Sequence, residues 1–575
     1  MNAARLGWKN PWAWLALGLA GWAAAWLVTW GHFGFSAWEP QGSLADWQAT
    51  RLWEEWRWDV PEKVTHVETF LVDGKAYMYF GPGPAFLRFL TYIFGPAEPG
   101  TWSRGLVCLG VLATLALVLS LIQWIARVRS EEGLPSALKP GWVGGFLLLL
   151  GFGSTLPFLA SRAFVYHEAI VMGSAGALAS YLALAVYLRE PSKASLVAAG
   201  GFGIFAMLSR ASSGGGTAVA LGAVGLLLLT VPEAGRRGAA AAAWLGITKR
   251  EGSRAEGMLA LTMAALILAS FGYVNHAKFG DATQGVPLQY HVSYQEDGRL
   301  EKVGGTLLHL RNVPRNLYSY LHPGHVLFDE TFPWVYPTLA SAIPLPAGEE
   351  EPPPNLGRPS RRVRVYAEPD WVAKSAFPNT YADFIERYAS ATAVMPGLLL
   401  LALIGFASLL REGGGAGPWL RLPMLGALAG AFPFLMSVGI SHRFLHDAFP
   451  AAAIACVLGV FALADLPRGM PKKALVAVLL VAGLWGAWAN SALAISYQRI
   501  FSWGTPFFFK TQFNRTQADV DEWVGQQLGI EIENTWRIGP AQEPRTQLRP
   551  TPSSIATRRA LPAPVPAERD TTSAG

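Results

Sequence analysis

The chain has 575 residues, of which 51% are hydrophobic and only 15% are charged, with a formal net charge of +6. A soluble protein of this length would carry about a quarter charged residues and divide into several domains. Here the apolar residues collect into long uncharged runs, so the composition excludes an ordinary soluble protein and favours lipid as the solvent. The basic residues lie mostly in short loops, so they indicate membrane topology and no nucleic-acid partner.

The apolar runs predict transmembrane helices, each of which needs about 20 apolar residues. The first run follows a basic end with Arg5 and Lys9 and has no small-residue cleavage site after it, so we interpret it as a retained anchor. The sequence predicts an all-α polytopic membrane protein with about 11 spans (range 10–13) and a small mixed α/β extracytoplasmic portion. The predicted spans are 11–30, 105–126, 141–160, 169–188, 196–208, 217–231, 258–274, 394–410, 422–440, 450–466 and 474–497.

Lysine and arginine in short loops predict the orientation, because they are more frequent on the cytoplasmic side. With a cytoplasmic N-terminus, seventeen of them lie in inner loops and three in short outer loops. The inner residues are Arg5, Lys9, Arg127, Arg129, Lys139, Arg189, Lys193, Arg236, Arg237, Lys249, Arg250, Arg254, Arg411, Arg421, Arg468, Lys472 and Lys473. The outer residues are Arg162, Arg210 and Arg443. This asymmetry predicts an N-terminus on the cytoplasmic side.

This topology divides the chain into five parts. They are an N-terminal membrane bundle at 1–274 with an outer loop at 31–104, an extracytoplasmic domain at 275–393, C-terminal membrane helices at 394–497, an extracytoplasmic extension at 498–540, and a tail at 541–575. Within the extension, Thr511 to Leu528 is predicted as an amphipathic helix. The tail is rich in Pro, Ala, Arg and Thr without periodicity, which predicts disorder.

The outer loop 31–104 carries the most local signals. Residues 43–58 are predicted as an amphipathic helix in the headgroup layer, with an apolar stripe of Ala45, Ala49, Leu52, Trp53 and Trp56. Residues 65–80 are predicted as a β-hairpin around the turn pair Asp73-Gly74. After a Gly-Pro-Gly-Pro break, the apolar stretch 85–94 is too short to span, so we expect it to enter the interface or pack against the bundle.

No motif of a soluble enzyme is present: there is no phosphate-cradling loop, no nucleotide fingerprint and no metal-ligand spacing. We interpret Gly214-Gly215-Gly216 as loop glycines. The candidates are therefore ionisable residues near membrane depth, which are costly there and often functional. Asp46 fits a general base facing a cavity at the membrane surface. It also fits a capping box, because an N-cap at Ser43 would place it three residues into the helix.

The short outer loops hold the other candidates. His167 and Glu168 lie together after Arg162 and suit an acid/base pair, whereas the N-terminal dipole of a helix would equally favour Glu168. Arg210 follows a short span, and His442 with Arg443 lies between two later spans. Arginines that converge on one face would bind a lipid phosphate through paired N–H groups. The alternative for each is a contact with lipid headgroups.

Three stretches, with the layout of an acidic outer loop after the first span, resemble the GT-C class of membrane glycosyltransferases. They are DGKAYMYFGPGP at 73–84, VYHEA at 165–169 and RFLHDAFP at 443–450, and the resemblance covers roughly 1–230 and 395–500. It implies a bacterial cytoplasmic-membrane enzyme that transfers a sugar from a polyprenyl-phosphate carrier to an extracytoplasmic acceptor with inversion. Asp46 would be the base and Glu168, beside His167, a second acidic group. Arg210 and Arg443 would bind the phosphate, assisted by His442 and Arg162.

The resemblance implies no cofactor; these residues do not require a divalent metal, although they would allow one. Two other classes stay open. A transporter or flippase for a lipid-linked molecule would explain the short predicted spans 196–208 and 217–231 as interrupted helices. A non-catalytic membrane scaffold would explain the charged groups as structural contacts.

Overall fold

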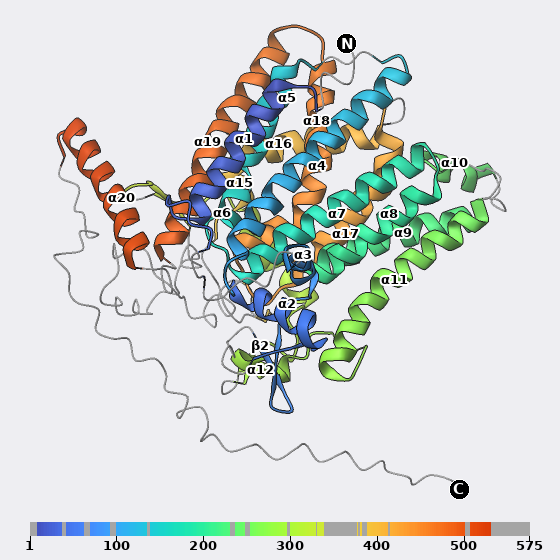
Figure 1. The fold of residues 1–575 in the computed structure, drawn as a ribbon. Helices are drawn as coiled ribbons and strands as arrows, with labels where there is room; N and C mark the ends of the chain where they lie inside the picture. Colours follow the sequence, from blue (N-terminus) through green and yellow to red (C-terminus); the bar gives the residue numbers. More distant parts are fainter. Residues whose placement is uncertain are drawn as a thin grey trace.

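The computed structural model describes most of the chain, and Figure 1 shows its path. The described residues are 8–36, 39, 42–61, 69–92, 99–134, 138–230, 236–247, 253–283, 285–295, 299–328, 331–337, 377, 380–381, 388–411, 415–500 and 507–530. The predicted disordered tail at 541–575 lies outside them.

The described residues contain eight helices that are long and apolar enough to cross a membrane. These are α1 (Pro11–Val28), α4 (Ser103–Glu131), α7 (Val165–Arg189), α9 (Ala211–Thr230), α11 (Ser253–Phe279), α17 (Gly417–Met436), α18 (Phe449–Asp465, preceded by the 3-10 turn η8, His442–Ala448) and α19 (Met470–Ile500). Three shorter apolar helices lie among them: α5 (Pro140–Gly153), α8 (Lys193–Ser209) and α16 (Pro396–Leu410). The chain is thus an α-helical multi-pass membrane protein.

Two predicted spans are not single helices. The span 141–160 is divided between α5 and the short α6 (Leu156–Ala160), because Ser154 takes an extended conformation. Pro157 then starts the new helix, where its missing N–H costs nothing. In the same way the span 394–410 contains the end of α15 (Ala391–Val394) and then α16, which begins at a proline.

The interpretation of Gly214-Gly215-Gly216 as loop glycines is wrong, because all three lie inside α9. A Cβ atom on Gly214 would collide with the backbone of Met207 in α8, and one on Gly216 would collide with the carbonyl oxygen of Gly426 in α17. Small residues let helix backbones approach closely in membranes. Here they allow α9 to pack against two helices at once.

The helix α7 lies at the centre of the bundle and every residue from 165 to 181 is buried. It packs against α4, α8, α9 and α17, which surround it in Figure 1. Its first turn carries Tyr166, His167 and Glu168. Any polar group on this turn is therefore enclosed by protein and not by lipid.

The outer loop folds over one end of the bundle, at the bottom of Figure 1. It consists of α2 (Ser43–Glu55), β1 (Asp59–Val60), β2 (Thr69–Val72), β3 (Lys75–Met78) and α3 (Gly83–Tyr92). The hairpin is confirmed: Val72 pairs with Lys75, and both turn residues between them have positive φ, as a two-residue hairpin turn requires. The short stretch after the Gly-Pro-Gly-Pro break forms α3, which packs on α2, α7 and α8.

The predicted helix 43–58 is shorter than expected, because Trp56 takes a left-handed conformation that ends α2 at Glu55. Three residues of the predicted stripe, Ala45, Ala49 and Leu52, are buried. Trp53 and Trp56 are exposed, however, so these tryptophans do not belong to the buried face. Asp46 is buried together with these three residues of the stripe.

The remaining described elements are mostly short. They are α10 (Arg236–Trp244), η4 (Leu288–Tyr290), η5 (Val292–Tyr294), α12 (Arg299–Lys302), η6 (Leu310–Asn312), α13 (Val313–Leu321), β4 (Leu327–Phe328), β5 (Val335–Tyr336) and α20 (Phe507–Leu528). A bridge between Phe70 and His291 joins this region to the hairpin, and one between Leu308 and Ser437 joins it to the residue after α17. The helix predicted at 511–528 is confirmed as part of α20.

Candidate functional site

A buried ion-pair cluster is formed by Asp46, Arg88 and Glu168. We call these three residues the carboxylate trio, because two carboxylates share the one arginine. Arg88 on α3 directs its Nε at Asp46 on α2, and its Nη1 and Nη2 lie 2.6 and 3.1 Å from the carboxylate oxygens of Glu168 on α7. All three side chains are at most 2% exposed. Two carboxylates around one guanidinium leave one formal negative charge in excess.

The local sequence explains why Arg88 points inward. In α3 the buried residues include Pro84, Ala85, Arg88 and Tyr92, a helical spacing that forms one face. The helix starts close to the end of α8, since a Cβ on Gly83 would collide with Ser209. The arginine is thus the one charged member of an otherwise mostly apolar face. Its side chain points into the protein, where it contacts the two carboxylates.

The structure tests one of the two interpretations of Asp46. The capping box is wrong, because Gly42 is the N-cap of α2 and no side chain caps this helix. The carboxylate of Asp46 instead accepts hydrogen bonds from Arg88 and from the backbone N–H of Gly100. Glu168 does lie in the first turn of α7, as the dipole interpretation requires, but it also binds Arg88.

The protonation state of Arg88 follows from these contacts. Burial disfavours its charge, but the fields and hydrogen bonds of Asp46 and Glu168 outweigh this cost, so the pKa of the Arg88 guanidinium is raised above its ordinary value. Arg88 therefore keeps its charge at any pH at which the protein is folded. The excess negative charge belongs to the two carboxylates together.

A second cluster, which we call the arginine pair, consists of Arg210 and Arg443. Arg210 caps the end of α8 and forms a two-point ion pair with Asp447, with Nε–Oδ1 and Nη2–Oδ2 distances of 3.1 and 2.6 Å. Arg443 lies with its guanidinium carbon 4.1 Å from the centre of the Tyr166 ring, a cation–π contact. The cluster thus brings two arginines and the carboxylate of Asp447 together.

The arginine pair is electrostatically coupled. Burial disfavours the charge on Arg210, but Asp447 outweighs it and raises the pKa of this guanidinium. The like charge of Arg443 opposes that rise, so the two cations lie within each other's field. The Arg210 side chain is 18% exposed, in contrast to the fully enclosed Arg88. Of these two side chains, only that of Arg210 is partly exposed.

The first turn of α7 connects the two clusters. Tyr166 lies under Arg443, and Glu168, two residues further on, binds Arg88. The end of the hairpin covers this turn, with the Phe80 ring 6.2 Å from the Tyr166 ring. Lys278, in the last turn of α11, donates hydrogen bonds of 2.8 and 2.9 Å to the carbonyl oxygens of Met78 and Phe80 and so fixes the hairpin. The two clusters therefore lie on one continuous set of elements.

Arg162, predicted as a phosphate ligand, belongs to a third cluster. It shares the carboxylate of Glu39 with Arg104 of α4, whose Nη2 lies 2.9 Å from Glu39 Oε2. Its guanidinium carbon also lies 4.2 Å from the centre of the Phe164 ring. All three charged side chains are fully buried. This cluster joins α1, α4 and the loop before α7, because Arg104 also donates to the carbonyl oxygen of Val28.

The predicted histidines are buried and face backbone atoms. His167 Nδ1 lies 3.1 and 3.0 Å from the carbonyl oxygens of Leu159 and Arg162, so this nitrogen carries the proton. His442 Nδ1 lies 3.2 Å from the carbonyl oxygen of Ala389. These contacts give both rings a positioning role for the loops before α7 and α18. Neither ring contacts the carboxylate trio through a hydrogen bond that the structure describes.

Arg88, Glu39, Arg104 and Asp447 are the members of these clusters that sequence reasoning missed or left without a role. Arg88 could have been found, because it is the single charge in the apolar stretch 85–94, and such charges are costly in a membrane environment. Asp447 lies in the RFLHDAFP stretch that carries the resemblance. Glu39 and Arg104 flank predicted elements and look like ordinary loop charges.

The loop that carries His442 and Arg443 is held by α13. The side chains of Arg315 and Asn316 donate hydrogen bonds to the carbonyl oxygens at the end of α17, including a 2.9 Å bond from each to Ser437 O. These carbonyl groups have no partner within the helix. Burial lowers the pKa of Arg315 to about 10, but it stays charged at neutral pH and faces the negative end of the α17 dipole.

Close to α13, His325 predicts a dependence of stability on pH. Burial and the nearby His322 lower its pKa, and the hydrogen bond to the carbonyl oxygen of Ser319 only partly opposes this. In the unfolded chain the pKa of this histidine returns to about 6.5, so just below this pH the unfolded chain binds more protons than the folded protein. The free energy of unfolding therefore falls as the pH drops through about 6.5. We expect His325→Gln to reduce this loss between about pH 7.5 and 5.5, measured as the midpoint of thermal unfolding. His276→Gln, at an exposed position, is the control. An unchanged pH profile in His325→Gln would contradict the assignment.

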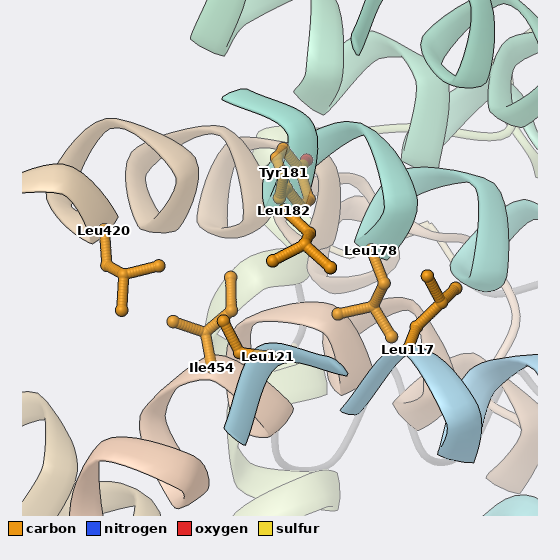
Figure 2. Close-up of a pocket in the computed structure, with 7 residues that line it drawn as sticks. All are labelled: Leu117, Leu121, Leu178, Tyr181, Leu182, Leu420 and Ile454. Atoms are coloured by element: carbon orange, nitrogen blue, oxygen red, sulfur yellow. The ribbon is translucent and has the colours of Figure 1, made fainter. Parts of the chain in front are cut away.

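Figure 2 shows a pocket between α4, α7, α17 and α18. Its volume of about 10 Å³ is at the limit for one water molecule. The lining residues are Leu117, Leu121, Leu178, Tyr181, Leu182, Leu420 and Ile454. None of the predicted site residues is among them, so this pocket is a small gap in helix packing and no substrate site.

Across the part of the chain that the structure describes, no group of three or more His, Cys, Asp or Glu side chains could hold a metal ion. Comparison of the sequence with models of known protein families and with curated proteins gives no match. The proposals below therefore depend on the geometry of the three clusters.

Proposed function

We propose that this membrane protein transfers a sugar from a polyprenyl-phosphate carrier to an acceptor at the outer face of a bacterial cytoplasmic membrane. The eight long helices and three shorter apolar helices together would give eleven spans, with the N-terminus in the cytoplasm. In this topology the carboxylate trio and the arginine pair lie near the outer membrane surface. The GT-C resemblance supplies the reaction class.

One observation carries the proposal: the first turn of α7 contacts two groups of charged side chains, one with two carboxylates around an arginine and one with two arginines and a carboxylate. Glu168 belongs to the carboxylate trio, and Tyr166 contacts Arg443 of the arginine pair. A phosphate monoester or diester needs cationic ligands, and an acceptor hydroxyl needs a proton acceptor. Side chains of both kinds contact this one turn, through Tyr166 and Glu168.

The chemistry assigns a role to each cluster. A carboxylate of the trio accepts the proton of the acceptor hydroxyl as its oxygen attacks the anomeric carbon. The bond between that carbon and the phosphate oxygen breaks, and the lipid phosphate leaves with the electron pair. Arg210 and Arg443 stabilise the negative charge of this leaving group. A single displacement inverts the anomeric centre.

In this scheme Arg88 positions the two carboxylates that accept the proton. It holds Asp46 and Glu168 on its two sides, so the pair shares one neutralising charge and keeps one negative charge. Because both carboxylates contact Arg88, we expect a substitution of either one to alter the position and charge of the other. We therefore assign the proton-acceptor role to the pair of carboxylates and not to Asp46 alone.

The test is sugar transfer from labelled polyprenyl-phosphate sugars in proteoliposomes. Asp46→Asn and Glu168→Gln should each lower kcat by about 10²–10⁴-fold, because removal of a general base typically has this effect. Glu54→Gln, an exposed glutamate on the same helix as Asp46, is the matched control and should stay active. Full activity of both site variants, with the wild type active, would remove the proposed roles.

A second candidate function is a non-catalytic membrane scaffold. The observation in its favour is that the carboxylates of the trio and the Glu39 cluster are at most 2% exposed and bound to arginines within the protein. Such pairs would give specificity to the fold without chemistry. A wild-type protein that transfers no sugar from any polyprenyl-phosphate donor, while it remains folded in the bilayer, would favour this candidate.

A further inference from the structure

Asp447 occupies the binding edge of Arg210 in the structure. Its two carboxylate oxygens accept from Nε and Nη2 of the guanidinium, at 3.1 and 2.6 Å. Asp447 lies near the end of η8, just before α18, whereas Arg210 is the C-cap of α8. The two residues are 237 positions apart in the chain. The pair is therefore a tertiary contact that can break without unwinding either helix.

A carboxylate and a phosphate compete for the same guanidinium edge. The planar carboxylate and the tetrahedral phosphate can each accept two parallel N–H hydrogen bonds. Such two-point contacts are among the strongest that arginine makes. A phosphate cannot take both Nε and Nη2 of Arg210 while Asp447 holds them. The Arg210 side chain is 18% exposed, so the protein does not enclose it completely.

The neighbours of Asp447 make the exchange electrostatically feasible. Arg443 adds a second positive charge within the field of Arg210, so the pair with Asp447 does not neutralise the cluster. The ring centre of Phe444 lies 5.9 Å from the guanidinium carbon of Arg210 and 5.2 Å from that of Arg443. An incoming anion would meet both arginines on aromatic surfaces.

We propose that Asp447 is an internal competitor for the phosphate site, which holds Arg210 in a closed state until a phosphorylated lipid displaces the carboxylate. This inference rests on the proposed function and adds a regulatory contact to the same site. It has a simple consequence: the free energy of breaking the Arg210–Asp447 pair reduces the observed affinity for the lipid. A protein without this carboxylate should bind the lipid more tightly.

The experiment measures the binding of polyprenyl phosphate to the full-length protein in nanodiscs, by native mass spectrometry. Asp447→Asn keeps the size of the side chain and one acceptor oxygen but removes the charge. We expect its affinity to rise about tenfold or more, the range of a charge-assisted hydrogen bond. Asp447→Glu keeps the competing charge and should show no such rise. Asp465→Asn, at the end of α18 and also paired with an arginine, is the matched control.

The arms separate this inference from the proposed function. The polyprenyl alcohol, which lacks the phosphate, should bind all variants alike, and inorganic phosphate should compete with the lipid. If Asp447→Asn binds equally or more weakly while Arg210→Gln loses binding, the competitor role is overturned but the phosphate site stands. If neither the wild type nor Asp447→Asn binds the phosphorylated lipid in preference to the alcohol, the phosphate site fails and the competitor role fails with it. The thermal midpoint of each variant checks that it is folded.

Discussion

Replacement of Arg88 by leucine is expected to lower the free energy of unfolding by about 3–5 kcal/mol, the usual cost of removing one partner of a buried ion pair. The side chain of Arg88 is fully buried and neutralises Asp46 and Glu168. Without it, two carboxylates would face each other away from water. At neutral pH this costs far more than the lost hydrogen bonds, because the dielectric response inside the protein is weak. The loss is measured as a lower midpoint of unfolding by heat or detergent.

Two controls accompany Arg88→Leu. One is a leucine at an exposed arginine, and the other also neutralises Asp46 and Glu168. Arg127→Leu removes an exposed arginine that pairs with Glu131 and Glu190, and should cost only about 0–1 kcal/mol. A triple variant, in which Asp46→Asn and Glu168→Gln accompany Arg88→Leu, carries no buried charge at this place. We expect it to recover much of the lost stability. An Arg88→Leu protein with a wild-type midpoint would show that the trio is solvated and not buried.

Glu39→Gln is expected to have an effect of similar size, about 3–5 kcal/mol of lost stability, for the opposite electrostatic reason. The glutamate is the carboxylate partner of both Arg104 and Arg162, and all three are fully buried. Glutamine keeps the shape but leaves two positive charges with no compensating carboxylate in this cluster. Because the cluster joins α1, α4 and the loop before α7, we also expect more protease cleavage in the chain between α1 and α2.

The comparison that isolates this effect is Glu54→Gln, the same substitution at an exposed position of α2. It should leave the unfolding midpoint unchanged. Arg162→Gln combined with Glu39→Gln returns the formal excess to one positive charge, and should restore part of the stability. If Glu39→Gln and Glu54→Gln unfold at the same midpoint, the Glu39 cluster contributes nothing and its description as a structural link is wrong.

The helical elements could be predicted because their signals are local. Long apolar runs located α1, α4, α7 and α19, and the turn pair Asp73-Gly74 located the hairpin. The errors arose where local signals conflict. Ser154 breaks an apolar run that looks continuous, and Gly214 to Gly216 look like a loop although close helix packing requires them.

The ion pairs could not be predicted, because their members are far apart in the chain. Arg88 lies 42 positions from Asp46 and 80 from Glu168, and no periodic pattern links such residues. The sequence did mark Asp46 and Glu168 as candidate site residues, because charges near membrane depth are rare. It could not show that a third residue from a short helix joins them. A prediction of the partner needs the fold of the outer loop.

For the same reason the structure brings only some of the predicted site residues together. Arg210 and Arg443 do lie in one electrostatic cluster, as converging arginines would. Arg162 lies in the Glu39 cluster, and His442 contacts the backbone of Ala389. Their predicted role in binding a lipid phosphate stays a prediction. The geometry favours Arg210 and Arg443 as the primary ligands.

The most direct test of the central claim is photo-crosslinking with a polyprenyl phosphate that carries a diazirine next to the phosphate. We predict that the labelled peptides contain the hairpin end around Tyr79, the first turn of α7 around Tyr166, or η8 around Arg443, and that excess unlabelled lipid suppresses the labelling. Labels confined to the lipid-facing surfaces of α11 and α19, without suppression, would contradict the claim. The phosphate would then have no site beside the carboxylate trio.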